Sequence, residues 1–276
     1  MLNLWELFVA FILGIVEGLT EFAPVSSTGH MILVDDFLLH SKELFSPPVA
    51  NTFKVVIQLG SILAVVVVFK DRILNLLGLK KNMPGAENGP KLTLAQVLVG
   101  LIPAGVLGVL FEDYIDEYLF SVETVLIGLV IGAVLMIIAD YARPKRPSAE
   151  TVDQITYKQA LGTGLFQCLG LWPGFSRSGS TISGGVLLGM SHRAASDFTF
   201  IMAIPIMLGA SGLSLLKNWK YFTIDALPFF IVGFISAFIF ALISIRFFLK
   251  LINRVKLVPF AIYRIVLAAV IYFVFL

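Results

Sequence analysis

Charged residues are scarce in this sequence, and cysteine is nearly absent. Asp, Glu, Lys and Arg make up 14% of the 276 residues, whereas soluble domains contain about 25%. The single cysteine, Cys168, allows no internal disulfide, which excludes a secreted disulfide scaffold. The formal net charge of +2 is too small for a protein that binds nucleic acid. The first residues carry Glu6 and no Lys or Arg, unlike a cleavable signal peptide, so we expect them in the mature fold.

Apolar residues are correspondingly abundant. They make up 58% of the sequence, above the about 45–50% of soluble domains, and the mean hydropathy is +0.94. A helix needs roughly 17–20 apolar residues to cross a bilayer. The composition therefore excludes an ordinary soluble enzyme and predicts an all-α integral membrane protein. Six runs are long enough to span: Phe53–Phe69, Leu94–Phe111, Val122–Ala139, Phe198–Leu216, Leu227–Leu249 and Val258–Leu276.

Two further apolar regions are interrupted by polar residues. The first, Leu4–Leu39, is interrupted by Glu17, Glu21, Pro24 and the polar run 26–30. The second, Ala160–Met190, contains Pro173 and the polar run 176–181. Non-helical backbone survives at membrane depth only where protein or water surrounds it. These regions therefore predict a polar cavity inside the membrane rather than two more simple spans.

The basic residues predict how the spans are oriented. Lys and Arg gather in three connections, within 70–91, 143–158 and 246–256, and the connections between them are acidic or carry few charges. Basic loops stay in the cytoplasm, and with these three placed there the six spans alternate without conflict. The ends of each interrupted region then lie on one side of the membrane. Each region is therefore predicted to re-enter the membrane without crossing it.

The two interrupted regions also resemble each other. A shift of 150 residues aligns four identical pairs: Gly14 with Gly164, Leu19 with Leu169, Ser26 with Ser176, and Gly29 with Gly179. Three spans follow each region, and an odd number of spans per half makes the halves inverted copies. We therefore expect one membrane domain, 1–276, built from a repeat at 1–141 and an inverted repeat at 155–276. Each half would hold a re-entrant helix pair and three transmembrane helices, with a site near the midplane.

The polar residues of the first region could bind a cation or move protons. Glu17 and Glu21 are four residues apart and share one face of a helix. Paired carboxylates there suit a divalent cation, Mg or Ca, or a proton acceptor. Alternatively, they lie at the membrane interface and face water. The run Ser26-Ser27-Thr28-Gly29-His30 adds hydroxyls that could act as nucleophiles beside a base, or simply as helix caps.

The second region has the features of an anion site. Pro173 and Gly174 lead into a run of hydroxyl residues around Arg177, which reads as a loop that opens a helix. A helix N-terminus binds anions, and a guanidinium fork matches phosphate oxygens. Arg177 could instead be a structural partner of Glu17 or Glu21. Together the two regions suggest phosphoryl transfer. The sequence has no GxxxxGK[ST] motif, which excludes a P-loop nucleotide engine.

These motifs resemble the undecaprenyl-diphosphate phosphatase family of bacteria, of the bacitracin-resistance type. The resemblance rests on Glu17-Gly18-Leu19-Thr20-Glu21-Phe22, on 24–30, and on Pro173-Gly174-Phe175-Ser176-Arg177-Ser178-Gly179. It covers essentially the whole chain. It implies hydrolysis of a C55 polyprenyl diphosphate to its monophosphate and inorganic phosphate, which recycles the lipid carrier for cell-wall synthesis and confers bacitracin resistance. It also implies a multi-pass protein of the cytoplasmic membrane whose site opens to the outer face.

The resemblance further implies a role for each site residue. Ser27 is the expected nucleophile, Glu21 the group that takes its proton, and Arg177 the group that holds phosphoryl oxygens. Glu17 would bind a divalent ion, alone or with Glu21, and His30 would be either the acid for the leaving oxygen or a rival nucleophile. Hydrogen bonds to phosphate are expected from Ser26, Thr28, Ser176, Ser178 and Thr181.

Several alternatives stay open from the sequence. Inverted repeats with broken helices are also typical of transporters, so a polyprenyl-phosphate flippase is the competing hypothesis. Gly128 and Gly132 permit close helix contact, either within one subunit or in a homodimer. Lys54 and Arg264 are expected to form structural pairs. His192 lies near a span end, where we expect it in water.

Overall fold

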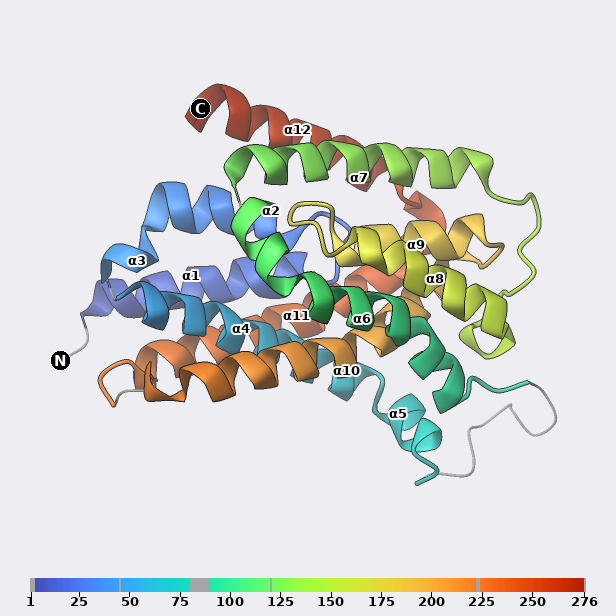
Figure 1. Cartoon of the computed structure of the whole chain (residues 1–276), viewed down its shortest axis with the longest axis horizontal. Helices are drawn as coiled ribbons and strands as arrows, with labels where there is room; N and C mark the ends of the chain where they lie inside the picture. The colour runs from blue at the N-terminus through green and yellow to red at the C-terminus, as the bar shows by residue number, and fades with distance from the viewer. Residues whose placement is uncertain (1–2, 45, 80–89, 120, 222–223, 276) are drawn as a thin grey trace.

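The structure is a computed structural model that describes the chain except residues 1–2, 45, 80–89, 120, 222–223 and 276. The basic residues Lys80 and Lys81 lie outside the described residues. Within the described part every regular element is a helix, which confirms the all-α class, and one isolated bridge joins Ala149 to Met190. The long helices run along the longest axis of the molecule (Figure 1).

Each of the six expected spans is a helix. They are α4 (Pro47–Val68), α6 (Leu94–Tyr118), α7 (Val122–Ala142), α10 (His192–Asn218), α11 (Leu227–Val255) and α12 (Val258–Phe275). Among the described residues, five of these are long and apolar enough to cross a membrane, whereas the apolar stretch of α12, Val258–Val274, is shorter. Large apolar side chains such as Leu110, Ile127 and Phe273 are exposed on them, as expected for surfaces that face lipid.

Each interrupted region forms a helix, a break and a second helix. The first contains α1 (Leu4–Thr20), α2 (Ser27–Met31) and a π-helical segment, η1 (Ile32–Leu39); the second contains α8 (Tyr157–Leu169) and α9 (Arg177–Leu187). Ser26 and Ser176 end the two breaks in the left-handed region, with φ of 69° and 73°. Each serine then accepts the N–H of the glycine three residues later, Gly29 or Gly179. The two breaks therefore share one local geometry.

The first helix of each interrupted region packs against the other half of the chain. Helix α1 lies on α11, where Gly14 and Gly18 closely approach the backbone of that helix. Helix α8 lies on α6, where Gly164 meets the backbone of Gly100. Helices α4 and α10 pack on each other, and α7 packs on α12 along one edge of the molecule (Figure 1). This crossed packing brings the two breaks toward the same place.

Other expectations about pairs and small residues can now be compared with the contacts. Lys54 pairs with Asp35 at 2.8 Å, as expected for a structural pair. Gly128 and Gly132 approach the backbone of the 173–175 break within the same chain. The expectation for His192 was wrong, because its ring is buried and bonds to Asp140 at 2.6 Å. The remaining short helices are α3 (Ser41–Leu44), α5 (Lys70–Leu76), η2 (Val152–Gln154) and η3 (Trp219–Tyr221).

Candidate active site

The two breaks bring a serine hydroxyl, a carboxylate and a guanidinium together. Ser27 Oγ donates a hydrogen bond to Oε2 of Glu21 at 2.7 Å. Arg177 Nη2 donates to Oε1 of the same carboxylate at 3.1 Å, although these two residues are 156 positions apart in the chain. Glu21 therefore links the hydroxyl of one half to the guanidinium of the other. Of the two glutamates considered as partners of Arg177, the structure pairs it with Glu21.

Arg177 keeps one donor free. Its side chain is 15% exposed, and its guanidinium lies 5.7 Å from the centre of the Phe22 ring. Nη1 is buried and has no hydrogen-bond partner among the described residues. Arg177 is also the first residue of α9, where backbone N–H groups lack partners within the helix. An unpaired guanidinium nitrogen at a helix N-terminus suits an oxygen of a phosphoryl group.

Arg264 of α12 fixes the break before Arg177 through hydrogen bonds. This arginine is fully buried, and its Nη2 donates to the carbonyl oxygens of Gly128, Gly174 and Phe175 at 3.2, 3.0 and 2.8 Å. The structural pairing expected for Arg264 is therefore made to backbone carbonyls rather than to a carboxylate. The absence of a side chain at Gly132 makes room for the Arg264 guanidinium, because a Cβ at this position would collide with it.

Replacing Arg264 by lysine is expected to lower phosphate release by about 100-fold. The lysine side chain is one atom shorter, so its ammonium would not reach the position from which Nη2 meets the three carbonyl oxygens. The break would then shift, and small misplacements of a positioning group can cost that much in rate. The measurement is kcat together with the melting temperature. Arg246→Lys, an exposed arginine on α11, is the control and should change neither. Unchanged kcat in Arg264→Lys would contradict the positioning role.

Two cavities meet at Ser27. One, of about 210 Å³, lies against Glu21, Ser176 and Arg177. The other, of about 480 Å³, extends from Ser27 past Glu17 toward Lys54. Three residues line both cavities: Ser27, Thr28 and Gln58.

Gln58 of α4 was not anticipated from the sequence. Its Oε1 accepts a hydrogen bond from Ser211 Oγ at 3.1 Å, and its side chain lines both cavities. Because the amide oxygen is bound, its NH₂ group can donate to a ligand. The available signal was an amide within the otherwise apolar run 53–69, since polar groups inside spans are functional candidates.

Glu17 lies in the larger cavity with an unsatisfied oxygen. The residue is 5% exposed, and its buried Oε1 has no hydrogen-bond partner among the described residues. Both oxygens of Glu21 are already engaged by Ser27 and Arg177. Within the described part of the chain, no cluster of three or more His, Cys, Asp or Glu side chains could hold a metal. A cation could still fit with Glu17, because Mg²⁺ is often held by one or two carboxylates and by substrate phosphates.

His30 has both ring nitrogens engaged. Nδ1 lies 2.8 Å from the carbonyl oxygen of Ser26, and Nε2 lies 2.7 Å from the hydroxyl of Tyr263. A carbonyl oxygen only accepts, so Nδ1 carries the proton and Nε2 of the neutral ring accepts from Tyr263. The ring also stacks on that tyrosine, and it is absent from the described lining of both cavities.

The remaining hydroxyls divide into two groups. Ser26, Thr28 and Ser176 line the smaller cavity. Ser178 does not, because it is buried and donates to the carbonyl oxygen of Ala23 at 3.1 Å, which ties the two breaks together. Thr181 is buried too and donates to the Arg177 carbonyl at 2.8 Å.

Known proteins are similar to this chain over nearly its whole length. A family model described as "Bacitracin resistance protein BacA" matches residues 10–270. The chain is 74% identical to an undecaprenyl-diphosphatase of Geobacillus sp. (strain WCH70), over 99% of this chain and 100% of that protein. It is 69% identical to an undecaprenyl-diphosphatase of Bacillus subtilis (strain 168), over 98% of each chain. It is 70% identical to undecaprenyl-diphosphatase 2 of Bacillus licheniformis, over 100% of each.

Proposed function

The chain belongs to the bacitracin resistance protein family, and from this premise we propose how its site works. The protein is an undecaprenyl-diphosphatase: it removes the terminal phosphate of undecaprenyl diphosphate and returns the monophosphate carrier to cell-wall synthesis. The observation that carries the mechanism is Glu21, which accepts a hydrogen bond from the Ser27 hydroxyl and another from the Arg177 guanidinium.

In the first step Ser27 attacks the terminal phosphorus. Its hydroxyl proton passes to Oε2 of Glu21, already 2.7 Å away, as the bond from the Ser27 oxygen to phosphorus forms. The bridging P–O bond breaks, and undecaprenyl phosphate leaves. The free Nη1 of Arg177 donates to the oxygens of the transferred group, where positioning and charge stabilisation supply most of the acceleration.

In the second step water attacks the phosphoserine. Its oxygen forms the new bond to phosphorus as the bond from phosphorus to the Ser27 oxygen breaks. Glu21 returns to that oxygen the proton it took in the first step, and inorganic phosphate leaves with the protons of the water. Ser26, Thr28 and Ser176 donate hydrogen bonds from the cavity wall, and Ser178 and Thr181 position the break. His30 supports this wall through Ser26 rather than acting as nucleophile, because both of its nitrogens are engaged.

A divalent cation, Mg or Ca, would be held by Glu17, with the substrate's own phosphate oxygens completing its coordination. When bound, it would neutralise charge on the diphosphate. The orphaned Oε1 of Glu17, which lines the cavity shared with Ser27, supports this assignment.

The layout in the membrane is also part of the proposal. Six spans and two re-entrant pairs form an inverted repeat, supported by the matched serine caps and the crossed packing of α1 and α8. The basic loops lie on the cytoplasmic side of the bacterial inner membrane. The larger cavity, which leads past Lys54 near the start of α4, then opens to the outer face.

The decisive experiment is phosphate release by purified protein in detergent. Undecaprenyl and farnesyl diphosphates are supplied with and without a chelator. We expect release from undecaprenyl diphosphate, at least tenfold slower after chelation because the diphosphate charge is then less neutralised. A flippase would release no phosphate. Glu17→Gln is the matched variant and should be slow with or without chelator. Full activity in chelator would contradict the cation assignment but leave the phosphatase proposal intact.

A further inference from the structure

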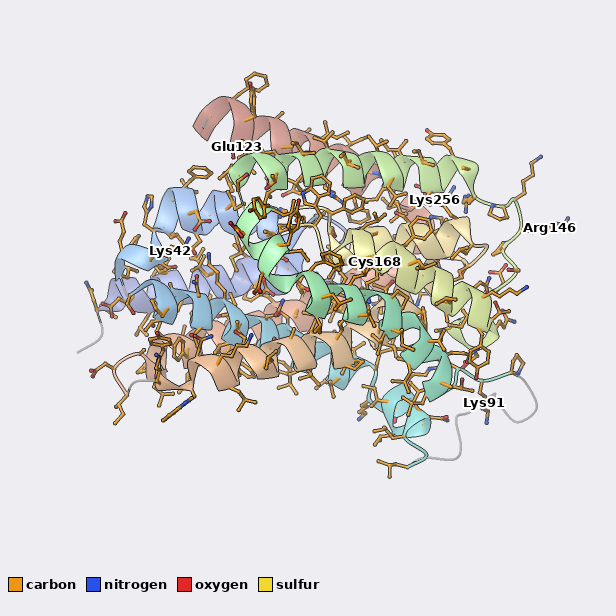
Figure 2. All side chains as sticks on the ribbon, in the orientation of Figure 1. Lys42, Lys91, Glu123, Arg146, Cys168 and Lys256 are labelled. Carbon is orange, nitrogen blue, oxygen red and sulfur yellow. The ribbon has the colours of Figure 1, made fainter. Side chains whose placement is uncertain are left out.

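A third polar cavity lies at the basic end of the protein, away from the catalytic site. It has a volume of about 300 Å³ and lies between the loop after α7, the turn from α9 to α10, and the end of α11. Figure 2 shows Lys256 and Arg146 at this end, Lys42 and Glu123 at the opposite end, and Cys168 between them. The cavity is lined by Arg143, Arg193 and Lys256, and among its described lining residues Glu150 is the one carboxylate.

The cations around this cavity have unused donors. Arg143 donates through Nε to the Asp140 carbonyl at 3.2 Å, and neither of its Nη groups has a partner in the described part of the chain. Arg193 pairs through Nε with Asp197 at 3.0 Å and donates through Nη1 to the Leu249 carbonyl. Its Nη2 has no hydrogen-bond partner among the described residues. The backbone N–H of Lys256 donates to the Ile252 carbonyl at 2.9 Å, but its ammonium has no hydrogen-bond or ion-pair partner among the described residues. Among the described lining residues, cations therefore outnumber carboxylates, with Asp197 paired to Arg193 from outside the lining.

The walls of the cavity are tied to one another. Ser148 N–H donates to the Gly189 carbonyl at 2.7 Å, and Ser191 N–H donates to the Ala149 carbonyl at 2.8 Å, so the loop is fixed on the α9–α10 turn. Buried Asp140 joins the third wall: Oδ1 bonds to His192 at 2.6 Å, and Oδ2 accepts the N–H groups of Leu257 and Val258 at 2.8 and 2.9 Å. The backbone segments that carry the cationic residues are therefore fixed to one another.

Lys256 has a strained backbone in this wall. Its φ is 59° and its ψ is −151°, a conformation that glycine adopts with less strain. Strained residues cluster at sites that bind ligands. Lys256 and the N-terminal residues of the long helix α10 line the same cavity, and both a cation and a helix N-terminus favour an anion.

We propose that this cavity binds a phosphate group. The guanidinium of Arg143 and the ammonium of Lys256, together with the remaining Nη2 of Arg193, match phosphate oxygens. Basic pockets between helices at the cytoplasmic surface accept phosphate-bearing lipid headgroups. The ligand chemistry is therefore a phosphate mono- or diester at the membrane surface, or free phosphate from the same compartment. The inference is independent of the catalytic proposal, because no lining residue is shared with the cavities at Ser27.

The test uses the full chain with Arg177→Gln, so that the catalytic cavity contributes little phosphate binding. One arm measures the rise in melting temperature with inorganic phosphate in detergent at constant ionic strength, since a ligand of the folded state stabilises it. The other measures retained phosphatidylglycerol against phosphatidylcholine in mixed micelles by native mass spectrometry. We expect phosphate-dependent binding in at least one arm. Binding only in the second arm would identify the lipid as the source, and binding in neither would overturn the proposal.

Matched variants locate the site. Arg143→Gln with Lys256→Gly should weaken binding at least about tenfold, because it removes two charged donors from the cavity. Lys145→Gln with Arg146→Gln removes two exposed charges from the same loop outside the cavity and should retain binding. Equal losses in both pairs would overturn the proposal, since they would show only general attraction to a basic surface.

A separate measurement excludes a folding defect. With Arg177 intact, the Arg143→Gln/Lys256→Gly protein should release phosphate from undecaprenyl diphosphate at the unmodified rate. Lys256→Gly alone relieves the strained backbone, so its melting temperature without phosphate should be equal or higher. Unchanged phosphate binding in that well-folded single variant would overturn the role of Lys256.

Discussion

Replacing Ser27 by alanine is expected to lower phosphate release by roughly 1,000-fold or more and to abolish a covalent intermediate. The reason is that loss of a nucleophile leaves only the contributions of binding and charge stabilisation. The structure supports Ser27 as the nucleophile, because its hydroxyl donates a hydrogen bond to Glu21 and the residue lines both cavities. The measurement is a rapid acid quench with undecaprenyl diphosphate labelled in its terminal phosphate, followed by mapping of the labelled peptide.

Ser26→Ala is the control for this experiment. Ser26 caps the next helix through Oγ, so its loss should cost about 1 kcal/mol of stability while the label stays on Ser27. Phosphoserine survives the acid quench, whereas phosphohistidine does not. A parallel alkaline quench therefore detects any label on His30. Label on His30, or normal turnover in Ser27→Ala, would contradict the assigned nucleophile.

Replacing Arg177 by lysine is expected to lower kcat by about 100- to 1,000-fold, the usual effect of removing one donor that stabilises developing charge. The guanidinium uses Nη2 for Glu21 and leaves Nη1 for substrate. An ammonium is a single point of charge and cannot serve both partners at these positions. The charge is kept, so a loss of activity would report geometry rather than net charge.

Arg72→Lys is the matched control for this second prediction. Arg72 also pairs with a carboxylate, that of Asp153, but it lines none of the cavities described here. Turnover by the Arg72→Lys variant should be unchanged. Added guanidinium ion should partly restore Arg177→Ala, because it can occupy the vacated position. Turnover near normal in Arg177→Lys would show that the bidentate fork is not required.

The sequence predicted the helices well because their signals are local. Each long apolar run became a helix. The two interrupted regions broke just before the expected polar runs, which themselves begin α2 and α9, with Ser26 and Ser176 in matched conformations. The motifs also located Glu21, Ser27 and Arg177. Gln58 was not predicted, because a single amide within an apolar run belongs to no recognisable motif. His192 was misjudged because its partner, Asp140, is 52 positions away in the chain.

By itself, the sequence determined the class of protein, the positions of its helices and the residue types of its chemistry, because composition and short-range periodicity reflect local preferences and the cost of polar groups in lipid. Only the tertiary structure decided which of those residues meet. It bonded Glu21 to both Ser27 and Arg177, engaged both nitrogens of His30, and turned Ser178 and Thr181 away from the cavity. Such contacts depend on how distant helices pack, and no local pattern encodes that packing.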